Sequence, residues 1–157
     1  MEIREMKTED VFIVADMEKR LFSDPWSFDS FKDSLKRDNM IFLVLEDEGK
    51  IAGYCGMMCV LDEGQILNIA VDTEYRRRGF ATEMMLAMLE FGMQNGISLY
   101  TLEVRESNIA AITLYAGCGF APNGRRKDYY SKPKEDAILM ELDFADPETL
   151  KRLGMDE

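Results

Sequence analysis

The sequence LNIAVDTEYRRRGFA, residues 67–81, decides the fold of this chain. Its apolar start, Leu67 to Val71, predicts a strand, and a basic loop that contains Gly79 follows a short turn. A long amphipathic helix is then predicted from about Gly79 to Asn95, because apolar residues recur at three- and four-residue spacing. These residues are Ala81, Met84, Met85, Met88, Leu89 and Gly92. A strand that feeds a helix in this way is typical of a sheet covered by helices.

The loop Arg76-Arg77-Arg78-Gly79 has the chemistry of a phosphate site. The first N–H groups of a helix have no intrahelical partner, and the helix dipole adds partial positive charge there. Gly79 has no Cβ, so a ligand can approach the backbone, and the arginines add fixed charge. A tight turn with solvated arginines has the same composition, so the loop alone leaves both interpretations open. It is neither a Walker loop nor a three-glycine dinucleotide fingerprint.

Length and composition indicate one globular domain over residues 1–157. Hydrophobic residues make up 46% of the chain and charged residues 31%, which excludes a disordered protein. No apolar run has the length of a membrane span, and the charged N-terminus does not resemble a signal peptide. The odd number of cysteines, 3, argues for a reducing compartment, so we expect a cytoplasmic protein.

The chain contains no histidine, which excludes Ser-His-Asp and Cys-His catalysis and histidine-ligated metal sites. Acid–base chemistry must therefore come from carboxylates, tyrosine, lysine, cysteine or water. Cys55 and Cys59 lie four residues apart in an apolar stretch, which favours packing over a metal site, and we expect no bound metal. The net charge of −11 disfavours a nucleic-acid partner and favours encounter with basic partners, although plain solubility explains it as well.

The remaining patterns predict a strand over residues 1–6 and a helix capped by Thr8, then a second helix capped by Ser27. The buried side of the first helix is expected to hold Val11, Phe12, Val14, Ala15 and Leu21. Further strands are predicted at 40–46, 51–61, 65–71, 98–105, 120–127 and 137–144, with turns at 47–50 and 62–64 and a long polar loop before residue 137. A short helix follows Ser107-Asn108, and Asp146-Pro147 predicts one more. This order predicts an α/β chain with a mixed sheet, helices on both faces, and a ligand site where the fourth strand ends.

The segment LEVRESNIAAITLYAGCGF, residues 102–120, places Asn108 and Tyr115 seven residues apart on one helix face. It resembles the second acetyl-coenzyme A half-site of the GNAT family of N-acetyltransferases. The loop Arg76–Ala81 is similar to that family's Gln/Arg-x-x-Gly-x-Gly/Ala signature, which holds the pyrophosphate. The resemblance implies the GNAT fold: a central, mostly antiparallel sheet, splayed between strands four and five, with helices on both faces.

Within the family, the chain most resembles the ribosomal-protein-alanine N-acetyltransferase type. The matching segments are PWS at 25–27, LNI at 67–69, EVR at 103–105 and RKDYY at 126–130. The resemblance implies a core of about residues 1–144 followed by a short C-terminal extension, residues 145–157. We further expect a monomer without contact to nucleic acid or membrane. The resemblance also implies an enzyme that acetylates the N-terminal alanine of a small-subunit ribosomal protein. The chain's charge of −11 suits such a basic acceptor. An α-amine, with an ordinary pKa of about 8, is also easier to deprotonate than lysine at about 10.4.

The resemblance also implies roles for individual residues. Glu103 is the candidate general base, acting through a water, and Tyr115 the candidate acid for the departing sulfur. Glu103 as a solvated or Arg105-paired carboxylate and Tyr115 as a core aromatic are the alternatives. Coenzyme contacts are expected from Ile69, Ala70, Val71, Arg76, Arg77, Arg78, Gly79, Phe80, Ala81, Thr82, Asn108 and Tyr115. Acceptor contacts are expected from Trp26, Tyr129 and Tyr130, with core packing or simple exposure as their alternatives.

Other functions would use the same cofactor residues. An acetyltransferase that acts on lysine side chains or small-molecule amines would differ only in its acceptor loops. A non-catalytic acyl-coenzyme A sensor would keep the loop Arg76–Ala81 but would have no need of Glu103 and Tyr115. The presence of both residues favours an enzyme.

Overall fold

A single seven-stranded sheet organises the computed structural model, which describes residues 1–155. The spatial order of the strands is β1-β2-β3-β4-β5-β7-β6. All neighbouring pairs are antiparallel except β4–β5, which is parallel. The strands are β1 (Glu2–Glu5), β2 (Met40–Asp47), β3 (Lys50–Val60), β4 (Glu63–Val71), β5 (Leu99–Arg105), β6 (Ala121–Ser131) and β7 (Lys134–Asp143). The mixed, mostly antiparallel sheet predicted from the sequence is confirmed.

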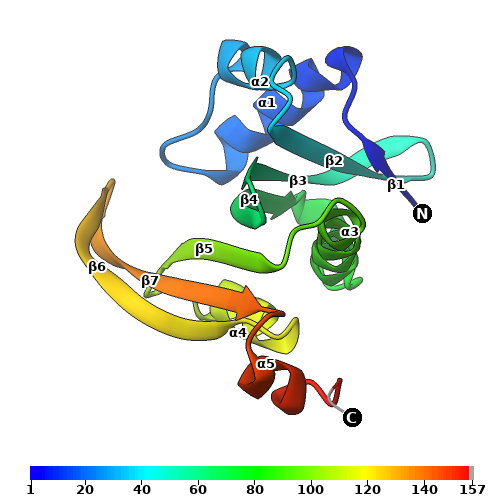
Figure 1. Cartoon of the computed structure of the whole chain (residues 1–157). Helices are drawn as coiled ribbons and strands as arrows, with labels where there is room; N and C mark the ends of the chain where they lie inside the picture. Colours follow the sequence, from blue (N-terminus) through cyan, green and yellow to red (C-terminus); the bar gives the residue numbers. More distant parts are fainter. Residues whose placement is uncertain (156–157) are drawn as a thin grey trace.

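Helices cover both faces of this sheet (Figure 1). The α-helices are α1 (Val11–Leu21), α2 (Phe28–Ser34), α3 (Phe80–Gln94), α4 (Ile109–Gly117) and α5 (Pro147–Arg152). Two short 3-10 turns, η1 (Thr8–Asp10) and η2 (Thr73–Tyr75), precede α1 and α3. One core contains the buried residues of α1 and α2, among them Val14, Met17 and Phe31. The other contains Met84, Met85 and Met88 of α3 and Tyr115 of α4, so the two helix pairs lie on opposite faces.

The sheet splays where β4 meets β5. The two strands pair only over Glu63–Gln65 of β4, and beyond Gln65 they separate. A β-bulge adds to this, because the register against β3 skips Leu67. The bulge reverses the side-chain alternation of β4: Ile66 packs in the α3 core, whereas Ala70, four residues later, packs with α1 and α2. The splay expected between strands four and five is therefore present, and it opens the sheet beside the start of α3.

Most predicted caps are confirmed. Ser27 accepts the backbone N–H of Ser30, Asn108 accepts that of Ala111, and Asp146 caps α5. α3 begins after Gly79, whose φ of 75° lies in the left-handed region. Such caps depend on neighbours within four residues, which is why the sequence reveals them.

The start of the first helix differs from the prediction. Thr8 is not its cap: the segment begins with η1, and the Asp10 carboxylate accepts the backbone N–H of Lys7 at 2.7 Å. Phe12, predicted on the buried side, is 75% exposed. The buried stripe runs through Val11 and Val14. Phe12 follows Val11 by one helical position, which turns it about 100° away from the core.

Two predicted loops are also wrong. The polar stretch 128–136 is not a long loop, because β6 and β7 continue as a hairpin to Ser131 and Lys134, which pair across the turn. The turn predicted at 62–64 lies at Leu61 and Asp62, so β4 already begins at Glu63. Leu61 is 94% exposed, with a φ of 56°. Both turns were predicted from composition, but the length of a strand is set by backbone pairing across the hairpin, so both predictions were misplaced.

Candidate active site

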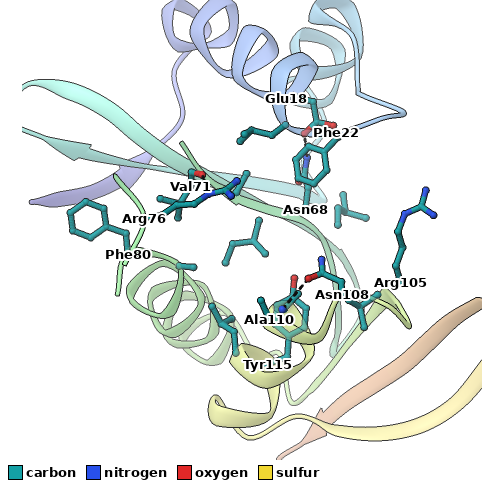
Figure 2. A pocket seen from close by; sticks show the side chains of 18 of the residues that line it. Glu18, Phe22, Asn68, Val71, Arg76, Phe80, Arg105, Asn108, Ala110 and Tyr115 are labelled. Atoms are coloured by element: carbon teal, nitrogen blue, oxygen red, sulfur yellow. Dashed lines mark hydrogen bonds between the residues drawn. The ribbon is translucent and has the colours of Figure 1, made fainter. Parts of the chain in front are cut away.

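A cavity of about 800 Å³ opens between the diverging strands β4 and β5 and reaches from the start of α3 to the end of α1. Figure 2 shows Glu18 of α1 and Phe22 just after it on one side, Arg76 and Phe80 on another, and Asn108, the N-cap of α4, with Tyr115 of α4 opposite. The predicted site residues that line it are Trp26, Ile69, Ala70, Val71, Arg76, Arg77, Gly79, Phe80, Ala81, Thr82, Glu103, Asn108, Tyr115 and Tyr130. Residues from four separate stretches of the chain thus share one cavity.

The wall at the start of α3 has the features of an anion site. Because α3 begins at Phe80, the N–H groups of its first turn have no intrahelical partners. A Cβ on Gly79 would meet no protein atom within 4 Å, so the space beside this backbone is open. Arg76 lies against the end of β4, where its Nε donates to the Val71 carbonyl at 3.3 Å. Arg78 does not line the cavity, since it pairs with Asp47 at 3.0 Å on the β2–β3 hairpin.

β4 supplies a second wall through Ile69, Ala70 and Val71. These residues lie beyond Gln65, where the pairing with β5 has ended. The backbone on that edge is therefore available to pair with an extended ligand, as an added strand would.

α4 contributes Asn108 and Tyr115 to the opposite wall. The Asn108 side-chain oxygen is used in capping, since it accepts the Ala111 N–H at 3.1 Å, so a ligand would be met by its Nδ2. Tyr115 is 9% exposed, and burial raises the pKa of its hydroxyl well above the ordinary value. The hydroxyl is consequently protonated near neutral pH and can act as a proton donor.

Glu103 enters the cavity from β5. Its neighbours Leu102 and Val104 are buried in the α3 core, so Glu103 faces the side of α1 and α2. Its side chain is 15% exposed and forms an ion pair with Arg126 at 3.3 Å. A hydrogen bond to Glu103 raises the pKa of Tyr129. The alternative pairing with Arg105 is wrong, because Arg105 binds elsewhere.

Arg105 instead holds the tip of the β6–β7 hairpin. Its guanidinium donates to the backbone carbonyls of Pro133 at 2.8 Å and Lys132 at 3.2 Å, and it pairs with Glu135 at 3.3 Å. It also lies 4.3 Å from the ring centroid of Tyr130. Ser23, from the loop after α1, donates to the same Lys132 carbonyl at 2.6 Å. The hairpin tip is thereby tied to both sides of the cavity.

The three residues predicted for acceptor contact are placed differently. Tyr130 lines the cavity, whereas Tyr129 is exposed and does not. Trp26 lines the cavity and also packs on Phe31, with 5.3 Å between ring centroids. Trp26 therefore packs against the core as well as lining the cavity, and its contact with an acceptor stays a prediction.

Sequence reasoning missed Glu18 and Asn68, which also line the cavity. Glu18 follows Val11 and Val14 at helical spacing, so the buried stripe of α1 already pointed to it. Asn68 lies inside the quoted stretch, but its orientation depends on the bulge at Leu67.

Two features are absent from the described residues, 1–155. No group of three or more Cys, Asp or Glu side chains there could hold a metal ion. No helix in that range is long and apolar enough to cross a membrane.

Comparisons with known proteins agree on one family. The family model for the acetyltransferase (GNAT) family matches residues 10–120. A putative [ribosomal protein bS18]-alanine N-acetyltransferase of Bacillus subtilis is 38% identical, over 88% of this chain and 92% of that protein. The Escherichia coli [ribosomal protein bS18]-alanine N-acetyltransferase is 34% identical, over 89% of this chain and 95% of its own length. A crystal structure of the ribosomal-protein-S18-alanine N-acetyltransferase from Escherichia coli superposes with a TM-score of 0.84 at 33% identity, covering 91% of this chain and 93% of that one.

Proposed function

This chain belongs to the acetyltransferase (GNAT) family, and on that premise we propose that it acetylates the N-terminal alanine of a small-subunit ribosomal protein. The relatives named above carry this activity in their names and share nearly the whole length of the chain. One observation supports the proposal most strongly. A single cavity brings the anion site at α3 together with a carboxylate, Glu103, and a buried phenol, Tyr115.

The residues present fit acetyl-coenzyme A, the co-substrate of the GNAT family. Gly79 leaves open the space that a pyrophosphate would need, beside the positive end of α3. The free edge of β4 suits the two amides of the pantetheine arm, and the Asn108 Nδ2 is a further donor. When bound, acetyl-coenzyme A supplies an activated thioester carbonyl.

Glu103 and Tyr115 divide the proton transfers between them. The acceptor amine must be neutral to attack the thioester carbon, and Glu103 accepts, through a water, the proton that the amine gives up. As the carbon–sulfur bond breaks, the Tyr115 hydroxyl donates a proton to the sulfur. Burial keeps Tyr115 protonated, as this role requires. Each such group typically contributes about a hundred- to ten-thousand-fold in rate.

An α-amine is the acceptor that suits this site. Its pKa of about 8 lies far closer to neutrality than the value of about 10.4 for lysine, so a carboxylate acting through water can deprotonate it. The chain's net charge of −11 also attracts a basic polypeptide. Steering by net charge weakens as the salt concentration rises.

The test is a set of peptides with acetyl-coenzyme A as donor, assayed at low and high salt. The peptides share one sequence that begins with alanine, with the N-terminus free or blocked and later positions basic or neutral. We expect fast transfer only to free N-termini, and a preference for basic peptides that shrinks at high salt. Equal rates for a blocked peptide with an internal lysine would refute the α-amine assignment. A neutral peptide that matches the basic one at low salt would refute the charge argument alone.

A further inference from the structure

Glu18 is a buried carboxylate that the mechanism above does not use. It lies on α1, is 3% exposed, and is surrounded by the aromatic core under α1 and α2. Its Oε1 accepts the Tyr54 hydroxyl at 2.5 Å, and its Oε2 accepts the Trp26 backbone N–H at 2.9 Å. Burial, followed by the charge of Glu18, raises the pKa of Tyr54 far above its usual value, so Tyr54 remains a donor.

Within residues 1–155, no arginine or lysine forms an ion pair with Glu18. Two arginines of the same cavity are engaged elsewhere: Arg76 binds the Val71 carbonyl, and Arg105 binds the β6–β7 hairpin. Within the same range, Arg77, the third arginine of the cavity, forms no ion pair with Glu18 either. A buried carboxylate without a cation is costly, because hydrogen bonds compensate only part of the lost hydration. Among the described residues, Glu18 therefore has neutral hydrogen-bond donors but no cationic partner.

The side-chain amide of Asn68, beside Glu18, also lacks good hydrogen-bond partners. Its Nδ2 reaches the Glu18 Oε1 only at 3.5 Å, and its buried Oδ1 has no hydrogen-bond partner. Figure 2 shows Asn68 between Glu18 and the opposite wall that carries Asn108 and Tyr115. Asn68 and Glu18 both line the cavity, so a ligand that donates hydrogen bonds would meet them together.

Glu18 and Asn68 lie on the same face of the sheet as Glu103, the face that α1 and α2 cover. The bulge at Leu67 turns Asn68 toward the α1–α2 face of the sheet. Glu103 faces the same side from β5, across the splay. An amine held near Glu103 on this face therefore lies in the same cavity as Glu18 and Asn68.

We propose that Glu18 and Asn68 form the subsite that receives the acceptor as its protonated, cationic amine, before Glu103 takes up the proton. The ammonium group supplies the charge that Glu18 lacks, and its three N–H donors suit the carboxylate and the Asn68 amide oxygen once that amide turns toward the cavity. This inference rests on the proposed function, since it assigns the binding step of the same reaction. It predicts that affinity depends on the charge of the amine and not only on the peptide that follows it.

The test compares two peptides that differ only in the amine. One begins with alanine, and in the other a propionyl group replaces the alanyl group. Their affinities are measured by titration calorimetry at pH 6.5 on enzyme loaded with coenzyme A, which cannot donate an acetyl group. We expect the parent to bind the alanyl peptide at least about tenfold more tightly, the size of a hydrogen bond to a charged group. The preference should shrink at pH 9.5, where an α-amine with a pKa of about 8 is neutral.

Single-residue variants test which side chain causes the preference for the alanyl peptide. Glu18→Gln should remove it, while Glu90→Gln, the same change at an exposed position of α3, should keep it. Glu103→Gln should also keep it, because Glu103 acts after binding. If Glu18→Gln does not fold, Asn68→Ala should still weaken the preference several-fold, since the contacts of Glu18 with Tyr54 and Trp26 remain.

Equal binding of the two peptides by the parent would overturn the proposal, as would a full preference in Glu18→Gln. A preference that disappears in Glu103→Gln and persists in Asn68→Ala would assign the ammonium to Glu103 instead. Acetyl transfer to the alanyl peptide by the parent is measured in parallel. Transfer without any amine preference refutes this subsite and leaves the proposed function intact, whereas absence of transfer to every free N-terminus refutes the proposed function itself.

Discussion

Replacing Arg105 with alanine should loosen the acceptor side of the cavity without affecting the coenzyme side. Arg105 connects the end of β5 to the β6–β7 hairpin through two backbone carbonyls, an ion pair with Glu135 and the face of Tyr130. Tyr130 lines the cavity, so its position depends on this connection. None of these contacts involves the wall at α3.

The magnitude follows from the contacts. Two charge-assisted hydrogen bonds, discounted for partial exposure, contribute about 1 kcal/mol each. The ion pair with Glu135 adds about 0.5 kcal/mol, and the cation–π contact with Tyr130 about 0.5 kcal/mol. Arg105→Ala should therefore lower the free energy of unfolding by about 2–3 kcal/mol, which is a fall in Tm of about 5–10 °C for a domain of this size.

The assay combines thermal unfolding with steady-state kinetics. We expect the KM for an N-terminal peptide to rise about tenfold, as positioning of the acceptor is lost, while the Kd for acetyl-coenzyme A stays within about twofold. Arg105→Lys should lie in between, because lysine keeps the charge but not the planar fork. Arg37→Ala, at an exposed arginine after α2, is the matched control and should change neither the Tm nor the KM for the peptide. The reasoning is refuted if Arg105→Ala melts and binds peptide like the parent.

Three further predictions test other parts of the structure. Gly79→Glu should weaken acetyl-coenzyme A binding steeply in a folded protein, because it places bulk and negative charge in the open space at the start of α3; unchanged affinity by calorimetry would contradict the anion site. Glu103→Gln should slow turnover about a hundredfold or more at neutral pH, and the rate should recover partly at high pH, where the amine loses its proton unaided. Tyr115→Phe should also slow turnover, with the affinity for coenzyme kept. Parent-like rates for both variants across pH would exclude these roles. Arg4 donates to Asp10 at 2.7 and 3.0 Å and lowers the pKa of that carboxyl. This ion pair therefore stabilises the folded protein above the unfolded pKa of about 4, and its contribution is lost as the pH falls through the lower pKa of the folded state. Asp10→Asn should accordingly cost about 1–2 kcal/mol in urea unfolding at pH 7 and progressively less as the pH falls below about 4. A cost that does not change with pH would show that the charge is irrelevant.

The sequence by itself determined the order of the elements and most of their ends. The helix after Gly79 and the caps Ser27 and Asn108 were predicted correctly, because hydrophobic periodicity and capping act between residues a few positions apart. The residues of the predicted coenzyme wall also share one cavity, apart from Arg78. They lie in two continuous segments, so resemblance along the chain was enough to select them.

Only the tertiary structure decided how the acceptor side is built. The bulge at Leu67 turns Asn68 toward α1, where it lies beside Glu18, fifty residues earlier in the chain. The ion-pair partner of Glu103 is Arg126 on a different strand, not Arg105 two residues away. Strand register and hairpin packing bring these groups together, and both depend on backbone pairing between distant segments. Local periodicity carries no information about such pairing. For this reason the sequence selected most residues that line the cavity at α3 and α4, whereas Glu18, Asn68 and the partner of Glu103 had to come from the fold.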